Sequence, residues 1–468
     1  MALSRIWSVF IIVAVLVALF KYLPSNGEKQ IFSSMVIGKN GDTLEVKKMS
    51  LAAADAGIVR ALDTVARVTQ NKVTYKKAGE ELVLLKVQSA NGIIDTCKDA
   101  INICIGLIGI LALFMGFMSI AEKAGGINVL SRIISPFFTR IFPEVPKGHP
   151  AFGHMMMNFS ANLLNLDNAA TPFGLKAMES LQELNPNKAT ASNSQLMFLC
   201  LHASGLTLIP VTIIAARAAL KAQNPTDIFV PCMVATFAAT MAAMFIVSFK
   251  QKINVFQPVI LGWVLGISAV IAALVLYLVN LDTKGLQSFS GVLSNGLILF
   301  IFIAIVLGAL YKKINVFDAF IEGAKGGFET AVRIIPYLVG MLVAISLLRT
   351  SGTFEVIIDG MKTLFMWLGA DTRFVDGLPT ALIKPLSGSG ARGMMIDTMT
   401  THGPDSFAGR LACILQGSSD TTFYVIAVYF GSVAVKNTRY AVGSMLLADL
   451  VGIITSILLA YLFFGAVA

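Results

Sequence analysis

The sequence has 468 residues, of which 56% are hydrophobic and 13% are charged, and its mean hydropathy is +0.76. Apolar segments of roughly 20 residues, the length that crosses a hydrocarbon core, recur along it. This composition excludes a soluble globular protein and predicts an all-α polytopic membrane protein. The formal charge of +9 fits basic cytoplasmic loops. Nucleic-acid binding is not expected, because no basic stripe with interleaved aromatic residues occurs.

The chain begins with an apolar run, Ile6–Phe20, that follows Arg5 and precedes Lys21. Such a run is typical either of a signal peptide or of a membrane anchor. No A-x-A-like cleavage site follows before Pro24, which favours an uncleaved anchor over residues 1–23. Whether the segment is removed stays open.

Residues 24–90 have the composition of a small soluble insert. Strand-like runs flank Asn40-Gly41-Asp42, which predicts a turn there. A polar helical pattern over Ala52–Gln70 and a second strand-like stretch, TYKKAGEELVLLKV, follow. The insert is too small for a large core and contains no recognisable chemistry, so we expect it to cap the protein or to contact a partner.

Two membrane units follow, over residues 91–255 and 313–468, joined by a two-helix connector over residues 256–312. The first unit starts with a span at Ile101–Ile120, and the amphipathic stretch after it predicts an interfacial helix. Further spans are expected at Leu196–Ala216, Phe229–Phe249, Pro258–Val279, Leu293–Tyr311, Ala331–Leu348, Leu411–Phe430 and Ala441–Phe464.

The stretch Gly377–His402 lies between two apolar segments, yet its Gly, Ser and Pro residues would break a helix and its charges would not face lipid. Irregular backbone at membrane depth is tolerated only where it is buried in protein or lines a wet cavity. The stretch therefore predicts a re-entrant hairpin, with an ordinary extramembrane loop as the alternative.

A second discontinuous stretch, Phe152–Leu184, occupies the matching place in the first unit. Each stretch is followed by a span with a polar break, LHASGLTLIP or LQGSSDTTFY. Interrupted segments in corresponding positions are the best sequence indication of a transporter binding site. If each hairpin enters and leaves on one face, an odd number of crossings separates the units, which predicts two inverted repeats. The positive-inside rule then places the N-terminus in the cytoplasm and the insert outside.

Polar residues in and after the two hairpins are the candidate site. Asp420 is the sharpest, since an unpaired carboxylate at membrane depth is costly; a structural ion pair is the alternative. Asn162, Asn165 and Asn168 recur every three residues, which predicts a shared helix face. The candidate substrate-binding residues are Asn162, Asn165, Asp167, Asn168, Thr171, His202, Ser204, Lys384, Ser387, Ser389, Arg392, Gln416, Ser418, Asp420 and Thr421. Asp420 and Asp449 are the candidate ion-coupling residues.

Some of these residues have an equally good structural interpretation. Asp449 and Asp167 could each form a structural pair with Lys384 or Arg392. The imidazole of His202 could make a hydrogen bond that packs helices, and asparagine amides also hold membrane helices together.

No cofactor, metal or enzymatic activity is expected. The five cysteines form no CxxC pair, and the four histidines are scattered. The motifs GxSxG, HExxH and GxxxxGK[ST] are absent.

Two long stretches carry a family resemblance. NLLNLDNAATPFGLKAMESLQ resembles spore maturation protein A, and LPTALIKPLSGSGARGMMIDTMTTHGPDSFAGRL with LQGSSDTTFYVIAVYFGS resembles spore maturation protein B. The chain thus resembles a natural fusion of the two, although its insert is longer than the connection expected in protein A. These families carry the nucleoside recognition (Gate) domain, which is related to segments of nucleoside transporters and of the ferrous-iron transporter B. The resemblance implies a multi-pass protein of the inner (cytoplasmic) membrane.

These observations together predict a transporter or permease for a small polar solute, nucleoside-like by family resemblance, with alternating access around the two hairpins. Na⁺ or H⁺ is the expected coupling ion, the lipid bilayer is the surrounding partner, and a homo-oligomer stays open. The alternatives are a channel or gate, and a non-transporting membrane scaffold for envelope or spore maturation.

Overall fold

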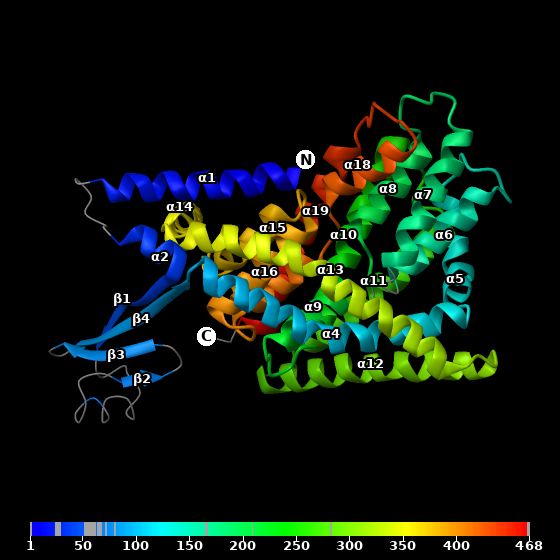
Figure 1. The fold of residues 1–468 in the computed structure, drawn as a ribbon. Coiled ribbons are helices and arrows are strands. Elements are labelled where there is room, and N and C mark those ends of the chain that lie inside the picture. Colours follow the sequence, from blue (N-terminus) through cyan, green and yellow to red (C-terminus); the bar gives the residue numbers. More distant parts are fainter. Residues whose placement is uncertain are drawn as a thin grey trace. The chain divides into compact units, whose positions relative to one another are not determined.

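The computed structural model describes residues 2–23, 30–50, 62, 68–70, 73–78, 81–163, 167–207, 209–280 and 283–465. The chain divides into two compact units. The larger unit comprises Met1–Leu3, Ile101–Met341 and Met361–Ala468, and the smaller comprises Ser4–Ala100 and Leu342–Gly360. Figure 1 shows both units and labels most of their elements.

The smaller unit contains a four-stranded antiparallel sheet. Its elements are α1 (Ala2–Tyr22), α2 (Ile31–Ile37), β1 (Gly38–Ser50), β2 (Val68–Gln70), β3 (Val73–Ala78) and β4 (Glu81–Asn91). The strand order is β1-β4-β3-β2. The sheet is tied to the segment Leu342–Gly360, because the Ser346 hydroxyl donates to the Asn91 carbonyl at 2.7 Å. The strand-like stretch TYKKAGEELVLLKV, residues 74–87, contributes to β3 and β4, as predicted.

Two sequence predictions for this unit are wrong. Asn40-Gly41-Asp42 is not a turn, because β1 continues through it and pairs with β4 on both sides; a register shift between Lys39 and Asp42 accommodates it as a bulge. The end of the predicted helix Ala52–Gln70 is strand β2, whose β-branched Val68 and Thr69 pair with β3. Residues 52–61 and 63–67 of that prediction lie outside the described residues.

The larger unit is helical, and α4, α13 and α14 continue into the smaller one. The helices are α4 (Ile93–Lys123), α5 (Gly126–Ile141), α6 (Pro150–Leu163), α7 (Asp167–Leu184), α8 (Asn193–Ser204), α9 (Val211–Ala219), α10 (Phe229–Gln251), α11 (Pro258–Val279), α12 (Thr283–Tyr311), α13 (Val316–Thr350), α14 (Thr353–Trp367), the 3₁₀ helix η2 (Arg373–Gly377), α15 (Leu378–Ile383), α16 (Gly388–His402), α17 (Phe407–Gly417), α18 (Thr422–Ser432) and α19 (Ala441–Phe464).

Five helical segments within the described part of the chain are long and apolar enough to cross a membrane. They are Ile93–Lys123, Phe229–Gln251, Val316–Thr350, Phe407–Ser432 and Ala441–Phe464. Shorter apolar helices cover Trp7–Tyr22, Pro258–Leu274 and Asn295–Tyr311. The composition-based prediction of a helical, multi-pass membrane protein is therefore confirmed.

One order of elements occurs twice along the chain. A long helix, a second helix, a helical hairpin, a broken helix and a final long helix follow one another from α4 to α10 and again from α13 to α19. The connector α11–α12 separates the two runs. In the first run the second helix, α5, is amphipathic as predicted and buries Ile127, Phe137 and Ile141 on one face.

The core of the larger unit is built on the final helices of the two runs. α10 packs along α19 (Figure 1). The short helices α8 and α17 each pack against both of them. Every residue of α8 from Ser194 to Ser204 is buried. A helix that is enclosed on all sides has no need of a polar face, which explains why α8 is apolar all round apart from its ends.

Candidate functional site

Two broken helices meet in the larger unit. α8 ends at Ser204 and α9 begins at Val211, while α17 ends at Gly417 and α18 begins at Thr422. The backbone N–H of Asp420 donates to the carbonyl of Ala203 at 2.7 Å. The first break thus provides a hydrogen-bond acceptor for a backbone N–H of the second. We call the two breaks, residues 205–210 and 418–421, together with the side chains around them the polar centre.

Local sequence accounts for the first break. Gly205 closes α8 with a φ of +60°, a left-handed conformation that glycine adopts without a Cβ penalty. The Thr207 hydroxyl then donates to the Gly205 carbonyl at 2.9 Å. Pro210 precedes α9 and has no N–H to contribute to a continuous helix. The predicted polar interruption of this span is thus a true end of one helix and start of another.

The second break is made by side chains that compete with the backbone. The Ser418 hydroxyl donates to the Leu415 carbonyl at 2.9 Å. The Asp420 carboxylate accepts from the Thr421 N–H at 2.6 Å, which leaves that N–H outside the helical pattern. α18 then starts at Thr422, whose hydroxyl donates to the Asp449 carboxylate at 2.6 Å.

The turn of the second hairpin, α15–α16, closes onto this break. Lys384 at the end of α15 is 7% exposed and donates to the Gln416 carbonyl. The Pro385 carbonyl accepts from the Phe423 N–H at 3.0 Å. A Cβ at Gly388 would lie 2.7 Å from the Thr421 hydroxyl oxygen, so only glycine allows this approach. The hairpin turn therefore supplies both a donor and an acceptor to the interrupted helix.

Charges at the second break match the helix ends that they face. The carbonyl end of α17 carries partial negative charge, and the Lys384 ammonium lies against it. The amino end of α18 carries partial positive charge, and the carboxylates of Asp420 and Asp449 accept from its first residues. Asp449 is 5% exposed, whereas Asp420 is exposed at this break.

The first hairpin, α6–α7, reaches the same centre through a cluster around His202. The imidazole Nδ1 lies 2.9 Å from the Asn162 amide nitrogen and 3.0 Å from the Asn158 amide oxygen. The Asn158 amide also donates to the Ala170 carbonyl at 2.7 Å, which ties α6 to α7. The His202 and Tyr429 rings are 4.7 Å apart, edge to face. The cluster thus joins the first hairpin to α8 and α18.

Asp420 links the two halves electrostatically. Its charge acts on His202 and Tyr429 on one side and on Lys384 on the other. The fold therefore brings together His202, Lys384 and Asp420, three of the residues singled out in the sequence.

The other predicted residues have mainly local contacts. Ser204 donates to the Leu201 carbonyl at 2.7 Å, and Ser387 caps α16 by accepting from the Gly390 N–H at 3.0 Å. Ser389 lies 3.3 Å from the Ser387 hydroxyl. Thr171 interacts with the Tyr429 phenol, and Arg392 is half-buried on α16 with its charge acting on Lys384.

The predicted asparagine face is wrong. α6 ends at Leu163 and α7 begins at Asp167, so Asn162 and Asn168 belong to different helices. Asn165 lies outside the described residues, as do the side chains of Asp167 and Asn168. The amides that do share a face are Asn158 and Asn162, one helical turn apart.

Sequence reasoning missed Asn158, Thr422 and Tyr429 at this centre. The i, i+4 spacing of Asn158 and Asn162 was a usable signal. Tyr429 gave none, because a tyrosine near the end of an apolar span is common at membrane interfaces.

The side-chain amide oxygen of Gln416 is a buried hydrogen-bond acceptor without a donor among the described residues. The side chain is 8% exposed, and its Oε1 has no hydrogen-bond partner within the described part of the chain. A buried polar atom without a partner costs free energy, which marks this amide as a candidate contact for a bound solute.

A network of ion pairs, absent from the sequence prediction, ties the two runs together away from the breaks. Arg217 on α9 is fully buried and lies 2.9 Å from the Asp227 carboxylate and 3.0 Å from that of Asp405. Arg410 on α17 lies 2.8 Å from the other oxygen of Asp227. The loop between α16 and α17 is thereby held to the loop between α9 and α10.

A corresponding contact joins the other two loops. The backbone N–H groups of Lys436 and Asn437 donate to the Ala189 carbonyl at 2.9 and 3.0 Å. The Ala191 N–H donates back to the Asn437 carbonyl at 2.9 Å. The loop between α7 and α8 is thus held to the loop between α18 and α19. In both contacts, the loop that follows the hairpin of one run binds the loop that precedes the final helix of the other run.

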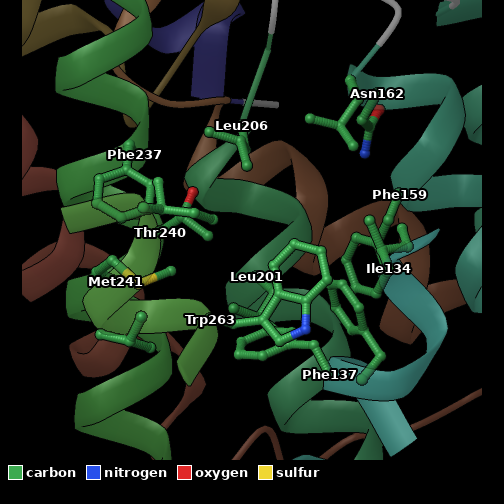
Figure 2. A pocket seen from close by; sticks show the side chains of 14 residues that line it. Ile134, Phe137, Phe159, Asn162, Leu201, Leu206, Phe237, Thr240, Met241 and Trp263 are labelled. Carbon is green, nitrogen blue, oxygen red and sulfur yellow. The ribbon is translucent and has the colours of Figure 1, made fainter. Parts of the chain in front are cut away.

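An apolar cavity of roughly 100 Å³ lies beside the first hairpin and adjoins the His202 cluster through Asn162 (Figure 2). Phe137, Phe159 and Trp263 form much of its wall, and Asn162 and Thr240 contribute polar groups. The cavity does not include the second break, so it lacks the charged groups of the polar centre. Among the described residues, no group of three or more His, Cys, Asp or Glu side chains could hold a metal ion.

Comparisons with known proteins identify relatives of the segments that form this centre. The Gate family model, described as nucleoside recognition, matches residues 104–220 and 331–436, which contain both hairpins and both breaks. Spore maturation protein B of Bacillus subtilis (strain 168) is 47% identical over 174 residues, 37% of this chain and 96% of the relative. Spore maturation protein A of the same organism is 44% identical over 149 residues, 32% of this chain and 76% of the relative. No solved structure matches. The chain therefore belongs to the spore maturation protein family that carries the Gate nucleoside recognition domain, with one part similar to protein A and another similar to protein B.

Proposed function

We propose that this membrane protein transports a small polar solute, nucleoside-like in chemistry, by alternating access around two re-entrant hairpins in the inner (cytoplasmic) membrane. One observation carries the proposal. Two broken helices touch at Ala203 and Asp420, and the Lys384 turn of one hairpin closes onto their junction. Interrupted helices that expose backbone groups at membrane depth are the usual way in which transporters bind solutes and ions.

The exchanged loop contacts support an inverted repeat. The order of elements is the same in both runs, and each run holds the other through equivalent loops. α10 and α19 lie side by side, and α8 and α17 each pack on both. Pairwise exchange of this kind is what a pseudo-two-fold axis between the two runs produces, and in inverted repeats that axis lies in the membrane plane. An odd number of crossings between the runs would place them in opposite orientations, with the N-terminus in the cytoplasm.

The polar centre favours a solute that donates hydrogen bonds. The exposed Asp420 carboxylate and the Gln416 Oε1 are acceptors, and ribose hydroxyls or base amino groups could donate to them. The imidazole of His202 and the amide of Asn162 provide adaptable partners on the other side. A phosphorylated solute would place its charge beside Asp420, so a neutral nucleoside fits better than a nucleotide.

Alternating access requires the hairpin turns to separate from the breaks. For the second hairpin this means loss of the Lys384–Gln416 and Pro385–Phe423 hydrogen bonds. A solute that bonds to the break could compensate for part of that loss, because the exposed backbone groups would find new partners.

The test is uptake of labelled nucleosides by liposomes that contain the purified protein. Asp420→Asn should abolish saturable uptake while the protein still inserts and elutes as a single species. Glu329→Gln, which neutralises an exposed carboxylate on α13, should transport as the native protein does. Native rates for Asp420→Asn would contradict the role of this residue. Passage of the solute that does not saturate with concentration would indicate a channel instead.

A non-transporting scaffold for envelope or spore maturation is the second candidate. The separate β-sheet unit favours it, because a soluble sheet could bind a partner, and the relatives are named for spore maturation. Deletion of residues 25–87 would then remove all function in the cell. Liposome uptake that survives this deletion would contradict the scaffold.

A further inference from the structure

The second helix break already contains a cation that belongs to the protein. Lys384 is almost completely buried, and its ammonium group donates to the carbonyl of Gln416 in the last turn of α17. A lysine rarely becomes this buried unless its charge has a function or a firm partner. Here the partner is a backbone carbonyl at a helix end rather than an adjacent carboxylate.

The surroundings are those of a cation site. The carbonyl end of α17 carries partial negative charge. The charge of Asp420 acts on the Lys384 ammonium from the same break, that of Asp449 acts on it from α19, and that of Arg392 acts on it from α16. Carbonyl and carboxylate oxygens are the ligands that hard cations prefer. A free Na⁺ at this point would compete with the ammonium for the Gln416 carbonyl oxygen.

We propose that the Lys384 ammonium is a tethered cation in the position where a coupling Na⁺ would otherwise bind, so that the break needs no free metal cation. Its consequence for coupling rests on the proposed transport function: solute movement would be independent of Na⁺. The occupancy itself does not rest on that function.

Because the Lys384 ammonium is covalently attached to the hairpin turn, the position of the hairpin determines whether its positive charge is present at the second break. Lys384 lies at the turn of the second hairpin, and the neighbouring Pro385 carbonyl accepts from Phe423. Movement of the hairpin away from the break would withdraw the ammonium together with that acceptor. A free ion would remain at the break or leave independently. The tethered cation therefore makes closure of the hairpin and neutralisation of the helix end one event.

The experiment measures thermal unfolding of the purified full chain in detergent, in NaCl, KCl or choline chloride at equal ionic strength. The native protein should show the same midpoint in all three salts. Lys384→Ala should have a lower midpoint in choline chloride. Na⁺ or n-propylammonium, which replaces the deleted atoms, should raise that midpoint in a saturable way, as a ligand of the folded state does. Lys221→Ala, which removes an exposed lysine, should behave as the native protein does.

Two results would overturn the proposal. One is a saturable rise of the native midpoint with Na⁺ at constant ionic strength, because it would demonstrate a free site for the ion. The other is a Lys384→Ala midpoint that is indifferent to every cation. Lys384→Gln, which keeps a hydrogen-bond donor on a side chain one bond shorter but loses the charge, is measured alongside in case the alanine variant does not fold. A Lys384→Gln midpoint that none of the cations changes would overturn the proposal in the same way. Neither result depends on uptake, so failure of the transport assay is distinguishable.

Discussion

Replacement of Arg217 by glutamine gives the most direct test of how the two runs are joined. The guanidinium is fully buried. It lies within 3.0 Å of carboxylate oxygens of Asp227 and Asp405, and it donates to the carbonyls of Asn224, Pro225 and Pro404 at 3.0, 3.2 and 2.5 Å. Glutamine is shorter and uncharged, so it can reproduce neither the fork of donors nor the charge.

The expected loss of unfolding free energy is large because the two carboxylates and the loop carbonyls that bind Arg217 would remain without it. Among the described residues, Asp227 and Asp405 would share Arg410 as the cation that remains within 4 Å, and the loop carbonyls would lose a donor. Removal of one member of a buried ion pair costs about 3–5 kcal/mol of unfolding free energy. Since about 1.4 kcal/mol corresponds to a factor of ten, the unfolding equilibrium should shift by roughly two to four orders of magnitude.

The assay is equilibrium unfolding by SDS in mixed micelles, read by intrinsic fluorescence. Lys221→Gln, at an exposed site a few residues away, should change the unfolding free energy by no more than about 0.5 kcal/mol. The double variant Arg217→Gln/Asp405→Asn should recover part of the loss, because it removes one of the orphaned carboxylates. An Arg217→Gln loss below about 1 kcal/mol, or strict additivity in the double variant, would refute the argument.

Two further substitutions test close helix approaches. Gly327→Leu on α13 should destabilise the protein by about 1–3 kcal/mol or more in the same assay, because a Cβ there would lie 2.6 Å from the backbone nitrogen of Ala112 on α4. Gly174→Leu should do the same and should also reduce uptake, since its Cβ would lie 2.5 Å from the Tyr429 ring. Gly308→Leu, where a Cβ meets nothing within 4 Å, is the control for both. Native stability of either variant would contradict the close contact at that glycine, because it would mean that the neighbouring segments leave room for a leucine side chain.

Local signals made the two helix breaks predictable. The residues responsible, Gly205 and Pro210 in the first break and Ser418 in the second, act on the backbone within a few positions of themselves. A capping serine such as Ser387 is equally local. Composition likewise revealed the membrane class, because the number and length of apolar helices depend on residue type rather than on tertiary contacts.

Features that depend on distant contacts were not predictable. Arg217 and Asp405 are far apart in the sequence, and no spacing rule connects them. The turn expected at Asn40-Gly41 failed for the same reason, since pairing of β1 with β4 overrides a local turn preference. The asparagine pattern failed because the end of α6 at Leu163 interrupts the period on which the argument relied.

The structure distinguishes the two carboxylates near the second break, Asp420 and Asp449, as candidate contacts for a solute. Asp449 is buried and bound by the Thr422 hydroxyl, so its charge is committed to the start of α18. Asp420 uses one oxygen for the Thr421 N–H and remains exposed. Of the two, only Asp420 has room for a solute without dismantling a helix end. If Lys384 supplies the cation at this break, the two aspartates do not need a metal ion for neutralisation, and Asp420 is left to recognise the solute.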